Sequence, residues 1–222
     1  MIETLFPNVE WDNMWEATLE TLYMTGMAVS ITFILGTMLG LILFLTSQGN
    51  LWEQKFVYSL TSAVVNVFRS IPFIILIVLL IPFTKILLGT IRGANAALPA
   101  LIIGAAPFYA RMVELALREI NKGVIEAARS MGAKTFTIIW KVLLPESLPA
   151  LISGLTVTAI ALVGYTAMAG VIGAGGLGNL AYLDGFQRSR DDVTLMATII
   201  ILIIVFALQA IGDVITKRID KR

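Results

Sequence analysis

Long apolar runs, rather than periodic apolar stripes, constrain this chain more than any other feature. The run from Thr21 to Leu45 contains no charged residue. A bilayer core about 30 Å thick is crossed by roughly 20 apolar residues in a helix that rises about 1.5 Å per residue. Five segments meet or approach that length: residues 21–45, 56–83, 95–117, 149–172 and 193–215. The sequence therefore predicts an all-α integral membrane protein with about five transmembrane helices, in which residues 1–222 form a single transmembrane domain.

Composition excludes several kinds of chemistry. The chain is 58% hydrophobic and 14% charged, and it has no Cys and no His. Disulfides, zinc sites with nitrogen or sulfur ligands and histidine acid–base catalysis are thereby excluded. No glycine loop is followed by a phosphate-binding Lys. We therefore expect no ATPase activity, no cofactor and no metal in this chain, and nothing suggests nucleic-acid binding.

Two of the predicted spans contain residues that bear on packing. Gly26, Gly36 and Gly40 lie in the first span, where small residues let another helix approach closely. Arg69 and Pro72 lie in the second span, so a buried charge and a kink are expected there.

The distribution of basic residues predicts the orientation, because cytoplasmic loops retain an excess of Lys and Arg. With the amino terminus outside and the carboxyl terminus in the cytoplasm, the basic residues on the cytoplasmic side are Lys55, Arg111, Arg118, Lys122, Arg129, Lys134, Lys141, Lys217, Arg218, Lys221 and Arg222. Those left outside are Lys85, Arg92, Arg188 and Arg190. An even number of spans would break this separation. The first 20 residues lack the basic segment of a signal peptide, so we expect the first helix to be retained.

The longest polar connection, residues 119–148, lies on the cytoplasmic side in this topology. Within it Val124–Met131 is predicted to form a short helix, with Gly132 as a left-handed cap. A second short helix, Phe136–Leu143, is expected to end before Pro145. Together they would form a helical elbow between spans 3 and 4, a shape suited to insertion into a groove on another protein.

The residues of this connection also match a known signature. Glu126-Ala127-Ala128 is followed by three residues, Gly132, nine residues and Val142-Leu143-Leu144-Pro145. This spacing resembles the EAA motif of permeases in bacterial binding-protein-dependent ABC importers, with Val142 in place of the consensus Ile. The resemblance implies that the first short helix is a coupling helix that docks on an ATPase subunit. The residues that it implies for this contact are Ile125, Glu126, Ala127, Ala128, Met131, Gly132 and Pro145.

Two more segments extend the resemblance to nearly the whole chain. Residues 68–72 (FRSIP) and 168–178 (MAGVIGAGGLG) are similar to the methionine-type permeases of that family. This implies a homodimer in the bacterial cytoplasmic membrane, with two ATPase subunits that bind ATP and Mg and an extracytoplasmic substrate-binding protein. The implied substrate is a small amino acid, methionine.

The glycine-rich segment after the fourth span has several interpretations. Gly173, Gly175 and Gly178 formally match a dinucleotide fingerprint, but no βαβ pattern surrounds them. A tight turn remains open as an interpretation, and so does a gate whose backbone must move or must approach a docked protein. We assign gating or structural roles to Arg69, Pro72, Gly173, Gly175, Gly176 and Gly178.

The candidate substrate pathway is the fourth span, where small residues leave room. Tyr165, Thr166 and Met168 are the candidates, since Met suits an apolar substrate side chain. The mechanism expected from the resemblance is alternating access. The alternative is an ion-coupled secondary carrier of a small solute, which should show several buried charges or an inverted repeat, and neither is evident.

Overall fold

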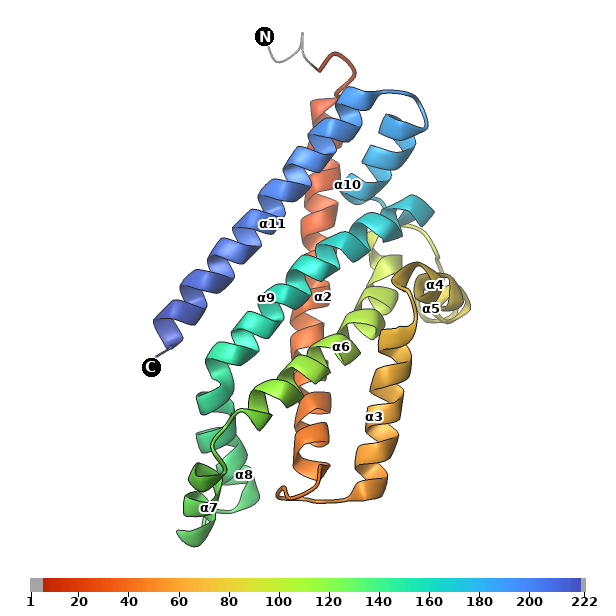
Figure 1. Ribbon diagram of the computed structural model, residues 1–222. Coiled ribbons are helices and arrows are strands. Elements are labelled where there is room, and N and C mark those ends of the chain that lie inside the picture. Colours follow the sequence, from red (N-terminus) through yellow and green to blue (C-terminus); the bar gives the residue numbers. More distant parts are fainter. Residues whose placement is uncertain (1–5, 221–222) are drawn as a thin grey trace.

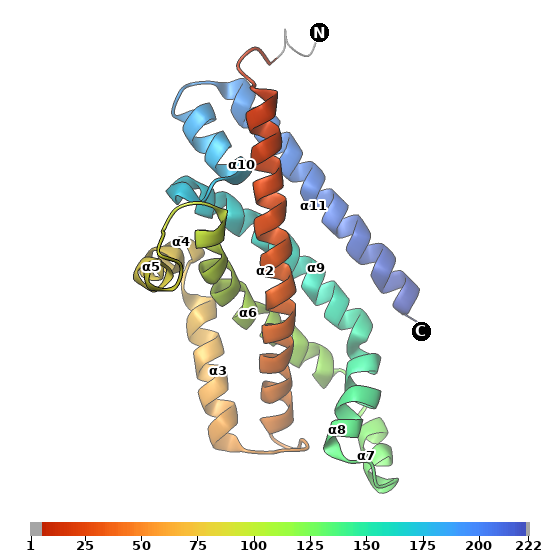
Figure 2. The same cartoon turned by 180° about the vertical axis from the view of Figure 1, so that it is seen from behind.

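Four long apolar helices and one broken helix pair make up the structure (Figures 1 and 2). The computed structural model describes residues 6–220, so Lys221 and Arg222 of the predicted cytoplasmic tail lie outside the described range. Within that range every regular element is helical, as predicted. The elements are α2 (Trp11–Thr46), α3 (Lys55–Ser70), α4 (Phe73–Leu79), α5 (Ile81–Leu88), α6 (Ala94–Arg118), α7 (Lys122–Ser130), α8 (Thr135–Ile138), η1 (Ile139–Leu143), α9 (Leu144–Ala169), η2 (Gly170–Ala174), α10 (Gly176–Asn179), η3 (Leu180–Phe186) and α11 (Asp191–Ile219).

Helices α2 and α6 make the most extensive helix–helix contact, and glycine permits it. A Cβ on Gly36 would lie 2.7 Å from the Tyr109 ring, and one on Gly40 would lie 2.5 Å from Val113 Cβ. A side chain at either position would push the helices apart, so the close helix approach predicted at these glycines is present at Gly36 and Gly40. It is absent at Gly26, where nothing in the described chain lies within 4 Å.

The second predicted span, residues 56–83, is not one kinked helix. α3 ends at Ser70, Ile71 and Pro72 are extended, and α4 leaves at 105° to α3. The extended backbone before Pro72 follows from the clash of the proline ring with a helical predecessor. The helix is therefore broken at the residues where a kink was expected, and α3 and α4 count as a fifth span only when they are taken together.

The fourth span begins much earlier than residue 149. The chain runs without interruption through α8, η1 and α9, from Thr135 to Ala169, so the prediction that the second elbow helix ends before Pro145 is wrong. A π-helical turn, η1, ends at Leu143, two residues before Pro145. Its wider winding accommodates a residue that lacks an N–H and would crowd the carbonyl one turn back.

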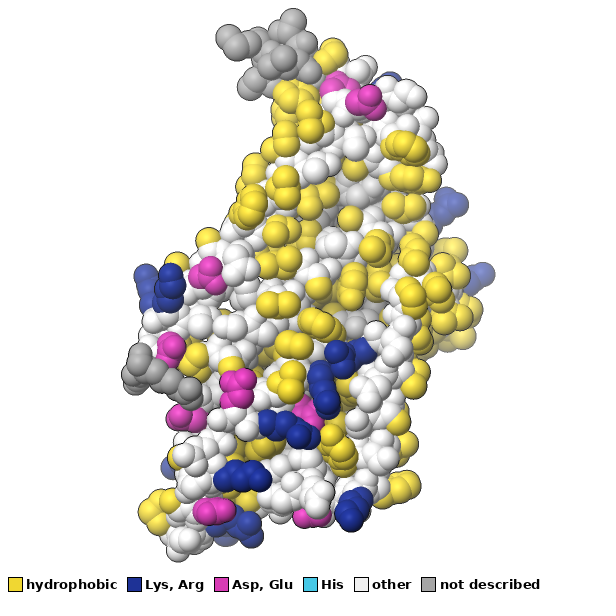
Figure 3. All heavy atoms as spheres, in the orientation of Figure 1, with side chains coloured by type: hydrophobic (Ala, Val, Ile, Leu, Met, Phe, Trp, Pro, Cys, Tyr) yellow, Lys and Arg dark blue, Asp and Glu magenta, His cyan; other side chains and the backbone are white. Residues whose placement is uncertain are grey.

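The surface is suited to lipid. α11 matches the predicted fifth span and exposes Leu202, Ile203, Phe206 and Ile211. Hydrophobic side chains cover much of the face in Figure 3, whereas most of its Lys and Arg side chains lie in the lower half, toward α7 and α8. This separation is what membrane insertion requires of the side chains.

Candidate functional site

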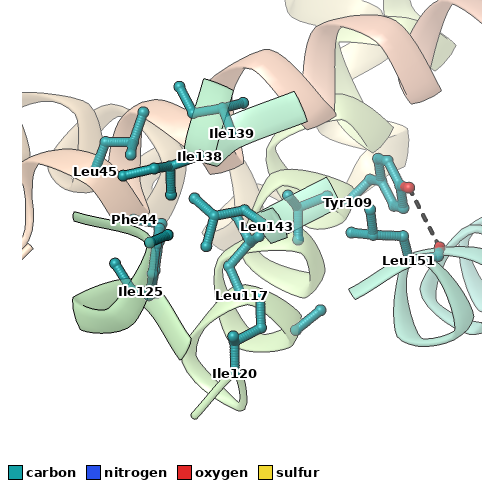
Figure 4. Packing of buried hydrophobic residues seen from close by; sticks show 13 residues of the cluster. Phe44, Leu45, Tyr109, Leu117, Ile120, Ile125, Ile138, Ile139, Leu143 and Leu151 are labelled. Carbon is teal, nitrogen blue, oxygen red and sulfur yellow. Dashed lines mark hydrogen bonds between the residues drawn. The ribbon is translucent and has the colours of Figure 1, made fainter. Parts of the chain in front are cut away.

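The elbow is anchored from within the protomer. Ile125 and Ala128 of α7 are buried in a cluster with Phe44, Leu117 and Ile138, and the close-up in Figure 4 shows all but Ala128 by name. The cluster joins α2, α6, α7 and α8. Two of the residues expected at the ATPase contact therefore hold the elbow in place instead of facing outward.

The opposite face of the elbow is open. Glu126, Ala127 and Gly132 are exposed, and so is Pro145 in the first turn of α9. Met131 is 82% exposed and Phe136 is 71% exposed, which is unusual for large apolar side chains at the polar end of the molecule. Both side chains are thus available for contact with another protein.

The turn at Gly132 is built as the sequence predicts. Gly132 has φ +79°, and its N–H donates to Arg129 O at 2.9 Å. The N–H of Ala133 donates to Ala128 O at 3.1 Å. These two bonds are those of a Schellman motif, which ends α7 and turns the chain toward α8.

A buried ion network lies just above the elbow, and sequence reasoning missed it. Glu114 is fully buried and pairs with Arg118 at 2.7 Å and with Arg111 one turn earlier on α6. Tyr58 of α3 donates to Glu114 Oε1 at 3.4 Å and accepts from Arg118 at 3.2 Å. The i, i+3 and i, i+4 spacings could have revealed the ion pairs, but only the fold brings Tyr58 to them.

The predicted glycines at the other end of α9 form a tight turn. The Glu20 carboxylate accepts a hydrogen bond from Gly176 N–H at 2.6 Å, and Gly93 N–H donates to Gly173 O at 3.0 Å. A side chain on Gly175 would overlap Glu20, and one on Gly178 would overlap the Ala167 backbone. Gly173, Gly175 and Gly176 also have positive φ. Of the open interpretations, the geometry favours a fixed turn held against α2 and α9.

The break in the second span lies against the candidate pathway. Arg69, in the last turn of α3, is exposed in the protomer and not buried as expected. It lines a niche of about 40 Å³ with Tyr165 and Gly104. The Tyr165 ring stacks on Phe73, directly after Pro72, with centroids 4.4 Å apart and planes 3° apart. Arg69, Pro72 and Tyr165 therefore belong to one place in the fold.

The three pathway candidates separate on α9. Thr166 is buried and donates to Val163 O at 2.8 Å within its own helix, so it faces the protomer interior. Met168 is exposed and follows Tyr165 by three residues, which places these two on one face. The structure thus brings Tyr165 toward Arg69 and separates Thr166 from both.

Comparison with known proteins identifies the family. Residues 36–222 match the model for the binding-protein-dependent transport system inner membrane component. The chain belongs to this family. It is 67% identical to the methionine import system permease protein MetP of Bacillus subtilis, with all of both chains covered. It is 45% identical to the probable D-methionine transport system permease protein MetI of Pasteurella multocida, over 96% of this chain and 98% of the relative.

Two solved structures share the fold. A chain from an inward-facing form of the MetNI methionine ABC transporter matches with a TM-score of 0.93 and 44% identity, over 96% of this chain and 100% of that one. A chain of an amino acid ABC transporter crystallised with histidines matches with a TM-score of 0.76 at 20% identity. The second likeness shows the fold alone.

Proposed function

We propose that this chain is the translocation subunit of an ATP-driven importer for methionine. The observation that carries the proposal is likeness along the whole chain to a permease named for methionine import. In this assignment two copies form the pathway, two ATPase subunits bind ATP and Mg, and an extracytoplasmic binding protein delivers the amino acid. The complex lies in the bacterial cytoplasmic membrane, and residues 1–222 are one transmembrane domain.

The elbow would be the docking site for the ATPase. Its outer face offers Glu126, Ala127 and Met131, while Ile125 and Ala128 bind it to the helices that it must move. With the amino terminus outside, this face lies in the cytoplasm, where the ATPase is. Because α8, η1 and α9 are continuous, a displacement at the elbow is passed directly into the fourth span.

The second copy would cover the open face of α9. Val157, Gly164 and Met168 recur there at helical spacing, and all three are exposed in the protomer. Closure of the ATPase dimer would bring the two elbows together. The α9 faces of the two copies would then separate on the outer side, and the pathway would open outward. The glycine turn, Gly173 to Gly178, would hold the outer end of α9 to α2 during this motion.

The test is purification of the tagged protein from its native membrane in mild detergent, followed by ATP-driven methionine uptake in proteoliposomes. Recovery of an ATPase at about one copy per permease, with uptake that requires ATP, is the expected result. Uptake by this chain alone, driven by an ion gradient, would instead make it a secondary carrier.

A further inference from the structure

Arg69 differs from the two arginines of the neighbouring helix α6. Arg111 and Arg118 are both paired with buried Glu114. Within residues 6–220, Arg69 makes no ion pair within 4.0 Å and no side-chain hydrogen bond within 3.5 Å. Charged side chains inside a membrane are expensive and are normally paired when their role is structural. The charge of Arg69 is therefore available to interact with a group outside the protomer.

The depth of Arg69 places it along the pathway rather than at its mouth. At about 1.5 Å per residue, Arg69 lies about 21 Å along α3 from Lys55, where the helix begins at the polar end. A hydrocarbon core is about 30 Å thick, so this is well inside it. Substrate sites in transporters recur where a membrane helix is interrupted, and α3 breaks directly after Arg69 and Ser70.

The niche beside Arg69 contains donors and no acid. Its polar lining residues are Arg69 and Tyr165, and the rest of its lining is apolar, including Phe68, Phe73 and Phe108. A hydrogen bond to a charged group is strengthened where apolar side chains exclude water. A guanidinium matches the two oxygens of a carboxylate. The volume of the niche, about 40 Å³, suits a small group rather than a whole amino acid.

We propose that Arg69, assisted by Tyr165, binds the carboxylate of the transported amino acid at the break between α3 and α4. This assignment rests on the proposed function and adds the position at which the substrate is held within the permease. The Tyr165 ring stacks on Phe73 and lines the same niche as Arg69. The substrate side chain then extends from the niche along the α9 face that exposes Met168.

The test uses the absence of cysteine from the chain. Met168→Cys introduces a single thiol on the same α9 face, and its modification by a thiosulfonate reagent is measured on this chain in the permease–ATPase complex. L-Methionine should protect the thiol, whereas L-methioninamide, which lacks the carboxylate, should not. In the same background, Arg69→Gln should raise the methionine concentration for half-protection by about tenfold or more, and Arg69→Lys by less.

Lys85→Gln is the matched control, because this exposed cation of α5 does not line the niche. Equal protection by methionine and methioninamide would overturn the proposal without any change at Arg69. So would unaltered protection in Arg69→Gln, or no protection by methionine in Met168→Cys alone. ATP-driven methionine uptake by the unsubstituted complex is measured in parallel. Only the absence of this uptake would contradict the proposed function itself.

Discussion

The two ends of α9 use glycine in opposite ways. At the elbow, Gly132 has positive φ and nothing within 4 Å of the position of its missing Cβ. At the outer turn, Gly178 would place a side chain inside the Ala167 backbone. The first glycine only bends the chain, whereas the second permits two segments to touch. A glycine motif therefore indicates a tolerant turn or a packing contact depending on its surroundings, and substitution separates the two.

The largest effect is expected at the outer turn. Gly178→Ala should lower the stability of the complex by about 3 kcal/mol, because rigid backbone cannot move away from the added methyl group. The measurement is the thermal unfolding midpoint of the purified complex in detergent. Gly26→Ala is the control, at a helical glycine of α2 with no atom within 4 Å, and should change stability by less than about 1 kcal/mol. Equal effects would mean that the contact at Gly178 is not rigid.

At the elbow the expected effect is on association rather than on stability. Met131→Ala should weaken ATPase binding by about 1–2 kcal/mol, roughly five- to thirtyfold, since large apolar anchors dominate interfaces. Quantitative pull-down of the ATPase measures this. Met38→Ala, at an exposed methionine on α2, should leave binding unchanged. Equal retention of the ATPase by both variants would remove Met131 from the interface.

Gly132 itself should tolerate a side chain at modest cost. Gly132→Ala places a Cβ in the left-handed region, which costs about 1–2 kcal/mol, and Gly132→Asn should cost less. Gly26→Ala, at a helical glycine with nothing within 4 Å, should be neutral or slightly stabilising. The midpoints of thermal unfolding compare the three. Destabilisation by Gly132→Asn beyond that of Gly132→Ala would show that space, not φ, limits this position.

The smallest effect is expected at the hydrogen bond from Gly176 to Glu20. Glu20→Gln keeps an acceptor oxygen and loses the charge, so it should cost no more than about 1 kcal/mol. The unfolding midpoint again reports it, with Glu16→Gln on the exposed side of α2 as the control. A loss as large as that of Gly178→Ala would mean that the turn depends on this charge more than on packing.

Hydropathy was sufficient for the spans that are simple rods. α6 and α11 begin and end within a few residues of their predicted limits, because long apolar runs with polar ends leave little choice. The same information could not separate a kinked span from a broken one, since α3, α4 and α5 are all apolar. Pro145 misled for a related reason: a local π-helical turn lets a helix pass a proline that ordinarily ends it.

The candidate site was predictable where the motif is local. Gly132 and the short helix before it follow from neighbouring residues, and both are present. Glu114 and Tyr58 lie 56 residues apart, and Arg69 and Tyr165 line one niche because α4, which follows the break, packs against α9. Such contacts depend on how helices that are distant in sequence pack together. This packing cannot be predicted from the residues of one segment alone.

The length of α9 also sets how far a tilt of this helix is transmitted. With 26 residues it is about 39 Å long, more than the thickness of a hydrocarbon core. A tilt of about 10° around one end would displace the other by about 7 Å. A small rocking movement imposed on one side of the membrane therefore becomes a displacement of several ångströms on the other.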